Sequence, residues 1–124
     1  MNVVDSSGWL EYFADGPNAD FFAPAIENLS ELIVPTISIY EVFKRVLQQR
    51  DESDALQAVA AMQQGRVVDL DAAIALRAAK VSAMSRLPMA DSIMLTTAQM
   101  HDAALWTQDA DFEGLAGARY IEKK

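Results

Sequence analysis

The chain has 124 residues, of which 52% are hydrophobic and 23% charged, values that fit one ordinary globular domain over residues 1–124. It contains no cysteine and a single histidine, His101, which excludes disulfide scaffolds, zinc–thiolate sites and iron–sulfur clusters. The formal net charge of −8 makes the chain a poor general nucleic-acid binder, because neutralising phosphates takes Lys and Arg.

The first third of the sequence predicts a strand, two helices and a second strand. The apolar pair Val3–Val4 ends at Asp5, and apolar residues at helical spacing follow, with Ser7 as the expected N-cap. A helix is predicted over residues 20–29, and the apolar run 32–34, closed by a proline, predicts a strand.

The middle of the sequence is predicted to be largely helical. Residues 38–41 read Ser-Ile-Tyr-Glu, which is the S-x-x-E pattern of a capping box at the start of an amphipathic helix. Further helices are predicted over residues 51–64 and from Asp71 to just before Pro88. At most a short strand, at residues 67–68, separates these two helices.

The last third predicts one more helix and two strands. Asp91 opens the helix, Ala104–Thr107 forms a strand that runs into an acidic loop, and Tyr120–Ile121 forms an edge strand. Strands that alternate with helices along a chain indicate an α/β fold, in which a parallel sheet carries helices on both faces.

Five acidic residues are predicted to gather at one edge of this sheet. Asp5 follows the first strand, Asp109 and Asp111 follow a later one, and Glu41 and Asp91 lie in the first turns of helices that begin at the same edge. Carboxylates brought together repel one another, and few bases lie near them in the sequence, so a divalent cation is the natural counter-ion. Ligands that are all oxygen favour Mg²⁺ or Mn²⁺.

Each of these acids also has an explanation that needs no metal. Glu41 is the expected capping-box partner of Ser38, and Asp91 is an acid in the first turn of a helix, where the helix dipole favours it. Asp5 suits an Asx-turn at the end of a strand, and the two later aspartates suit an ordinary polar loop. The metal hypothesis therefore depends on the coincidence of all these positions at one edge.

Four stretches of the sequence together resemble the PIN-domain ribonuclease toxins of the VapC type. They are Val3-Val4-Asp5-Ser6-Ser7-Gly8-Trp9-Leu10, Ser38-Ile39-Tyr40-Glu41-Val42, Leu87-Pro88-Met89-Ala90-Asp91-Ser92 and Thr107-Gln108-Asp109-Ala110-Asp111-Phe112. Their order, their spacing and the length of the chain agree with that family over nearly the whole sequence. The resemblance implies a PIN-like three-layer α/β/α fold around a central parallel sheet of about four to five strands.

The resemblance also implies an activity, that of a Mg²⁺- or Mn²⁺-dependent ribonuclease acting as the toxin of a type II toxin–antitoxin pair. Carried over residue by residue, the catalytic metal-binding acids are Asp5, Glu41, Asp91 and Asp109. Asp111 is an auxiliary metal ligand, and the hydroxyls of Ser7 and Thr107 support the acidic cluster.

The expected partners follow from the same resemblance. They are an RNA substrate, a cognate antitoxin and a second copy of the chain in a homodimer, which the apolar surplus of a small domain also favours. We expect an amphipathic antitoxin segment to dock near Trp9 and Phe43. No membrane-spanning stretch or signal-peptide pattern is present, so we expect a cytoplasmic protein with no membrane partner.

The basic residues of the chain are concentrated in one stretch. Residues 42–86 hold seven bases and five acids, and Lys44 and Arg45 are the bases nearest in sequence to Glu41. They are the candidate RNA contacts, and the plain alternative is a solvated helix face. Two other functions stay open, a non-catalytic PIN-like interaction module and a different metal-dependent phosphohydrolase.

Overall fold

The computed structural model describes all 124 residues, and its strands form one five-stranded sheet in the order β3-β2-β1-β4-β5. The strands are β1 (Asn2–Val4), β2 (Leu32–Pro35), β3 (Arg66–Val68), β4 (Ala104–Thr107) and β5 (Ala118–Tyr120). All neighbouring strands run parallel, so all strands end at the same edge of the sheet. The predicted α/β fold with a parallel sheet is confirmed.

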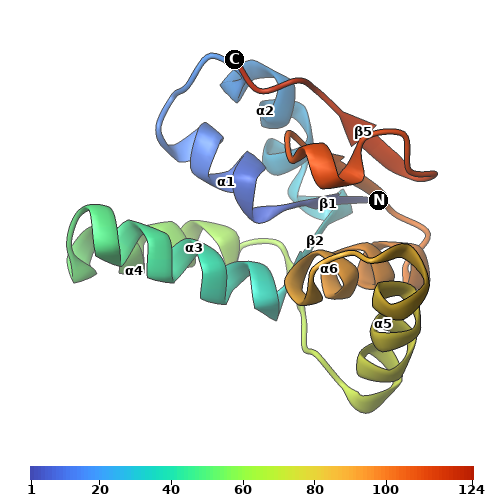
Figure 1. Cartoon of the computed structure of the whole chain (residues 1–124). Coiled ribbons are helices and arrows are strands. Elements are labelled where there is room, and N and C mark those ends of the chain that lie inside the picture. Colours follow the sequence, from blue (N-terminus) through green and yellow to red (C-terminus); the bar gives the residue numbers. More distant parts are fainter.

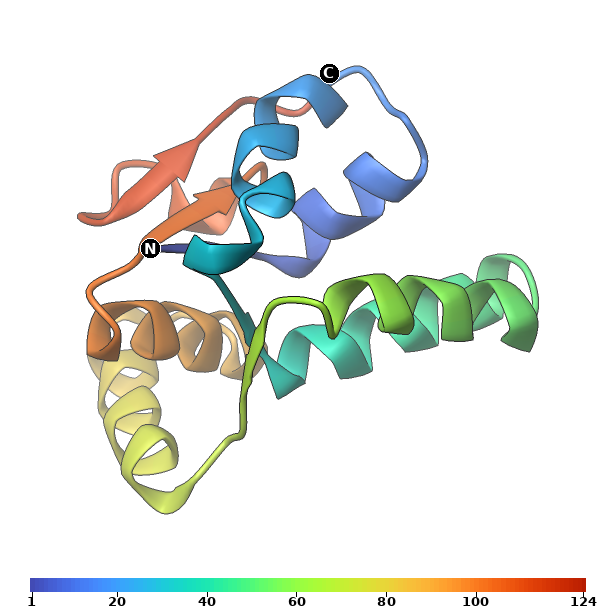
Figure 2. The same cartoon turned by 180° about the vertical axis from the view of Figure 1, so that it is seen from behind.

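Six α-helices and two short 3₁₀ helices surround this sheet (Figures 1 and 2). The α-helices are α1 (Ser6–Phe13), α2 (Ala19–Glu27), α3 (Thr36–Gln49), α4 (Glu52–Met62), α5 (Ala72–Ser85) and α6 (Met89–Met100). The 3₁₀ helices are η1 (Leu29–Glu31) and η2 (Ala110–Phe112).

The core lies in two layers, one on each face of the sheet. On β1, Val4 packs with Trp9 and Phe22 on the face covered by α1 and α2, and the core there continues to α3 and α4. Val3 points to the opposite face and packs with Met94 and Leu105 under α6. The alternation of side chains along a strand thus joins both layers through two adjacent valines, which gives the expected three-layer arrangement.

Helices α3 and α4 form a hairpin that projects from the body of the molecule (Figure 1). The chain ends beside α2 in both views (Figures 1 and 2), where the side chain of Asn18 donates a hydrogen bond to the Glu122 carbonyl. None of the helices combines the length and the apolar character that crossing a membrane requires.

The start of α1 differs from the prediction. Asp5, not Ser7, is the N-cap, and its side chain accepts a hydrogen bond of 3.0 Å from the Gly8 backbone N–H. Helix α1 therefore begins directly at the end of β1, with no intervening turn. An aspartate is as good an N-cap as a serine, so the local sequence does not distinguish the two positions.

The predicted capping box at residues 38–41 is wrong. Helix α3 begins at Thr36, immediately after Pro35 ends β2, so Ser38 is already the third helical residue. The Ser38 hydroxyl donates a hydrogen bond of 2.7 Å to the Pro35 carbonyl instead of capping a backbone N–H. Glu41 consequently lies in the second turn of α3, and capping no longer explains its presence.

Candidate metal centre

Asp5 is the most buried of the five predicted acids, with 3% of its surface exposed. Its carboxylate accepts three hydrogen bonds, from the Ser7 hydroxyl at 2.7 Å, the Thr107 hydroxyl at 2.6 Å and the Gly8 backbone N–H at 3.0 Å. Burial nevertheless raises the pKa of Asp5 to about 6, because these bonds offset only part of the cost of removing the carboxylate from water. The site thus holds this side chain in one orientation at an energetic cost.

Thr107 links Asp5 to the loop that follows β4. Its hydroxyl donates to Asp5 Oδ2 and accepts a hydrogen bond of 2.9 Å from the backbone N–H of Asp109. One fully buried hydroxyl therefore fixes the relative position of two acids that come from different strand ends. Ser7 and Thr107 make the contacts that a supporting role requires.

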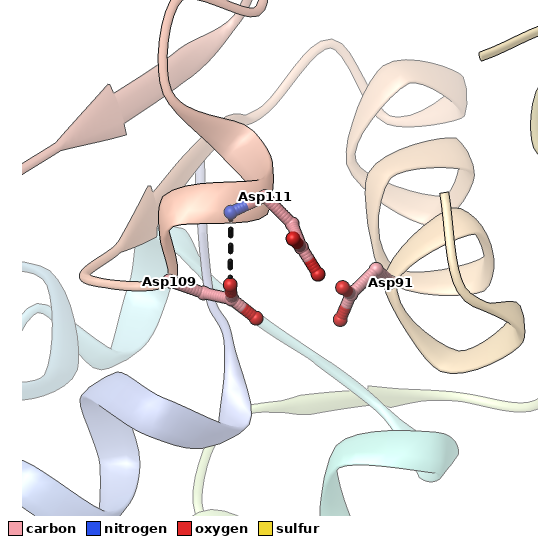
Figure 3. Close-up of side chains that lie close together, drawn as sticks. All are labelled: Asp91, Asp109 and Asp111. Atoms are coloured by element: carbon pink, nitrogen blue, oxygen red, sulfur yellow. Dashed lines mark hydrogen bonds between the residues drawn. The ribbon is translucent and has the colours of Figure 1, made fainter. Parts of the chain in front are cut away.

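Three aspartates come together in front of this pair of strands. Asp91 lies in the first turn of α6, and Asp109 and Asp111 lie at η2, after β4. One carboxylate oxygen from each lies within 4.8 Å of the others, and the three side chains point toward one another (Figure 3). Asp109 also accepts a hydrogen bond of 2.9 Å from the Asp111 backbone N–H, which tightens the loop.

The electrostatics of this cluster are unfavourable for three negative charges. The pKa of Asp91 is raised to about 7, first by loss of contact with water and then by the nearby carboxylates of Asp109, Asp111 and Asp5. The chain has two ion pairs, one from the N-terminal amine to Glu31 and one from Arg50, just after α3, to Asp54 in α4, and neither involves the cluster. The cluster therefore lacks a protein cation to balance its charge.

Glu41 approaches the cluster from another side. Its Oε1 accepts a hydrogen bond of 2.6 Å from the hydroxyl of Ser6, the first residue of α1 and the neighbour of Asp5. This bond joins α3 to the end of β1 across 35 positions of sequence. Glu41 is not one of the three acids that converge within 4.8 Å, and Ser6 was not singled out from the sequence, although it directly follows Asp5.

The donor set fits a hard divalent cation. Every available ligand atom is a carboxylate or hydroxyl oxygen, the kind that Mg²⁺ and Mn²⁺ prefer. Asp5 and Asp91 also lie at the N-terminal ends of α1 and α6, where the positive end of the helix dipole lessens the repulsion of the acids. The cluster contains no positively charged side chain, and a bound cation would supply the missing counter-charge.

The candidate RNA-contacting residues lie one turn along α3 from Glu41. Lys44 and Arg45 are both exposed, and the Lys44 ammonium lies 5.8 Å from the centre of the Tyr40 ring. No hydrogen bond or ion pair connects either base to the acids. They border the site along the helix and are free to meet an anion.

The expected docking surface is only half present. Trp9 is 1% exposed and belongs to the core, so the prediction of a partner segment against it is wrong. Trp9 belongs to the core cluster that contains Val4, and its ring stacks on the ring of Phe13 with the centroids 5.6 Å apart. Phe43, in contrast, lines an apolar groove of about 670 Å³ between α3 and α4.

Comparisons with known proteins agree with the fold described above. Three similar solved structures are a toxin–antitoxin complex from Klebsiella pneumoniae, the sarcin–ricin-loop-cleaving toxin VapC20 of Mycobacterium tuberculosis, and VapBC2 from Rickettsia felis bound to a fragment of its promoter DNA. Their identities to this chain are 22%, 14% and 10%, and their TM-scores are 0.82, 0.78 and 0.74. The matches cover 99%, 94% and 98% of this chain and 100%, 95% and 97% of the other chains.

At these identities the likeness establishes a shared fold. No curated protein matches the chain. The family model for the PIN domain matches residues 3–118, which includes every acid described above. The chain belongs to the PIN domain family.

Proposed function

We propose that this protein is a metal-dependent ribonuclease, the cytoplasmic toxin of a type II toxin–antitoxin pair. The observation that carries the proposal is the convergence of carboxylates from the ends of β1 and β4 and from the start of α6, with no protein cation among them. The shared fold with toxins of the VapC type supports the same assignment.

The ligands of the proposed ion are Asp5, Glu41, Asp91 and Asp109, with Asp111 as an auxiliary ligand, and the ion is Mg²⁺ or Mn²⁺. Such an ion supplies Lewis acidity toward a phosphodiester and lowers the pKa of water. Asp109 and Asp111 come from one tight loop and Asp91 faces them from α6, so these three aspartates are held by two independent elements.

The protein's own groups favour hydrolysis by water over a covalent intermediate. The chain has no cysteine, and the ring Nδ1 of His101 is 2.9 Å from the Thr97 carbonyl at the far end of α6. The hydroxyls of Ser6, Ser7 and Thr107 all donate to carboxylates. These hydroxyls hold the acids in place, and Lys44 and Arg45 are available to bind phosphates of the RNA.

The proposed partners are a cognate antitoxin and a second copy of the chain. The apolar groove at Phe43 supports a partner segment with apolar side chains, since Leu47 and Leu56 on its two walls are 43% and 53% exposed. Lys44 at its border favours an acidic residue in that segment. Light scattering on the purified chain tests the homodimer, and a strict monomer at high concentration would overturn it.

An RNA-cleavage assay distinguishes this function from its alternatives. We expect the purified protein to cleave RNA with Mn²⁺ or Mg²⁺, to stop with EDTA, and to lose activity in Asp5→Asn and Asp91→Asn. The matched control is Asp51→Asn, because Asp51 is the exposed N-cap of α4 and its side chain accepts only from the Asp54 backbone N–H. A non-catalytic module would leave RNA intact under all conditions, and a phosphatase would cleave only small phosphomonoesters.

A further inference from the structure

Behind the acidic cluster lies a pair of buried amide side chains. Asn18 Nδ2 donates a hydrogen bond of 2.9 Å to Gln108 Oε1, although the residues are 90 positions apart. Asn18 is 2% exposed and Gln108 is 6% exposed. Buried amides are uncommon in a core as small as this one, so their contacts call for an explanation.

Asn18 is fixed from three sides. Its backbone N–H donates to Glu11 Oε2 at 2.7 Å, and its side chain donates a second bond of 3.0 Å to the Glu122 carbonyl in the C-terminal segment. Gly16 makes room for this arrangement, since a Cβ there would lie 2.5 Å from Glu11 Oε1. Through its backbone and its side chain, Asn18 therefore joins α1, the α1–α2 turn and the end of the chain.

Gln108 connects Asn18 to the acids of the cluster. It lies between Thr107, which donates to Asp5, and Asp109, which is one of the three clustered aspartates. Its Nε2 faces the Ser7 carbonyl at 3.5 Å, on the first turn of α1. The side chain thus spans the space between the loop after β4 and the helix that begins at Asp5.

Stability alone does not account for this pair. Asn18 Oδ1 is buried and has no hydrogen-bond partner in the protein. An unpaired buried acceptor destabilises a fold, and an apolar side chain of similar size avoids that cost. Both side-chain hydrogen bonds of Asn18 are donated by its Nδ2 group, so these two donated bonds are the reason for an amide at this position.

We propose that Asn18 and Gln108 are positioning residues of the metal centre, which hold the Asp109 loop at a fixed distance from Asp5 and Ser7. This inference rests on the proposed metal-dependent function. Groups that orient metal ligands from behind are typically worth 10- to 100-fold in metal affinity. Neither residue touches the substrate or the ion, so both act through the ligands beside Gln108.

The test is Mn²⁺ affinity, measured by calorimetry on folded protein well below its unfolding temperature. Gln108→Leu removes both amide contacts, and Asn18→Leu removes the two hydrogen bonds that the Asn18 amide donates without burying a charge. Met62→Ala is the matched control, because Met62 is fully buried on α4, in the core layer that also holds Trp9 and Phe22, and α4 carries neither amide and none of the candidate metal ligands. It lowers stability without disturbing the amide pair.

We expect Gln108→Leu to weaken Mn²⁺ binding about 10-fold or more, Asn18→Leu to weaken it less, and Met62→Ala to leave it unchanged. If Gln108→Leu does not fold, Asn18→Leu carries the same comparison. Wild-type affinity in a folded amide variant overturns the inference and leaves the proposed function intact. A wild-type protein that binds no Mn²⁺ overturns the proposed function, and this inference with it.

Discussion

Thr107 at the end of β4 donates a hydrogen bond of 2.6 Å to Asp5 at the end of β1, across 102 positions of sequence. The two strands are neighbours in the sheet, with Val4 paired to Trp106, so their next residues necessarily meet beyond the strand ends. The same hydroxyl accepts the Asp109 backbone N–H. A single threonine thus connects the buried acid to the exposed loop that carries the clustered aspartates.

Replacing this hydroxyl should affect both stability and activity. Thr107→Val keeps the shape but leaves the Asp5 carboxylate without its shortest hydrogen bond, which we expect to cost about 2 kcal/mol of unfolding free energy. RNA cleavage should fall by about 10-fold, because Asp5 and Asp109 lose their common anchor. Urea denaturation and cleavage rates measure the two effects.

Thr97→Val is the control for this substitution. Thr97 is also fully buried, but its hydroxyl donates to the Ile93 carbonyl within α6 and touches no acid. We expect a smaller loss of stability and an unchanged cleavage rate. Equal effects of both substitutions on cleavage would contradict the anchoring role of Thr107.

The metal-free protein should lose stability as the pH rises. Asp5 and Asp91 have native pKa values of about 6 and about 7, above the ordinary aspartate value of 3.8. Native protein thus binds more protons than unfolded protein between the ordinary and the native pKa values. The contribution of these groups to the free energy of unfolding is therefore highest below about pH 4, falls from there to about pH 7, and is level above it. For Asp5 alone the fall is at most about 3 kcal/mol.

Urea denaturation in EDTA at pH 5 and pH 8 measures this dependence, and the Asp5→Asn protein isolates one contributor. We expect Asp5→Asn to be more stable than the wild type at pH 8, with the advantage shrinking at pH 5. Asp51→Asn, at the exposed N-cap of α4, should show no such pattern. A wild type and an Asp5→Asn protein with parallel pH profiles would contradict the buried, unbalanced charge.

The bases beside the site should set the salt dependence of cleavage. Lys44→Glu with Arg45→Glu should slow RNA cleavage and make the logarithmic salt slope shallower by about 1.4 on single-stranded RNA, because two phosphate contacts are lost. Folding and Mn²⁺ binding should stay unchanged, since both side chains are exposed and make no ion pair. Lys123→Glu with Lys124→Glu makes the same change of charge in the C-terminal segment, and an equal effect there would show that net charge alone matters.

The architecture was predictable because it follows from periodicity. The strand Ala104–Thr107 has the bounds that its apolar run predicts, and Asp71 caps α5 as expected. The starts of α1 and α3 could not be predicted from the sequence, since several residues near each start are suitable caps. Which one caps depends on where the preceding strand ends, and pairing with β4 sets the end of β1 while pairing with β3 sets the end of β2.

The acids of the candidate site were also accessible to sequence reasoning, because their positions after strands and at helix starts place them at one edge. The sequence did not reveal that Asp111, and not Glu41, lies close to Asp91 and Asp109. This grouping depends on the tight bend of η2. Asn18 and Gln108 gave no local signal at all. Their burial arises only when the C-terminal segment packs over the α1–α2 turn.

The central claim, a divalent cation held by these acids, is tested most directly by anomalous diffraction from crystals grown with Mn²⁺. We predict an anomalous peak among the carboxylates of Asp91, Asp109 and Asp111, on the side that faces Asp5, and its loss in Asp91→Asn crystals. A map with no peak at this position, or with a peak that persists in Asp91→Asn, would contradict the account.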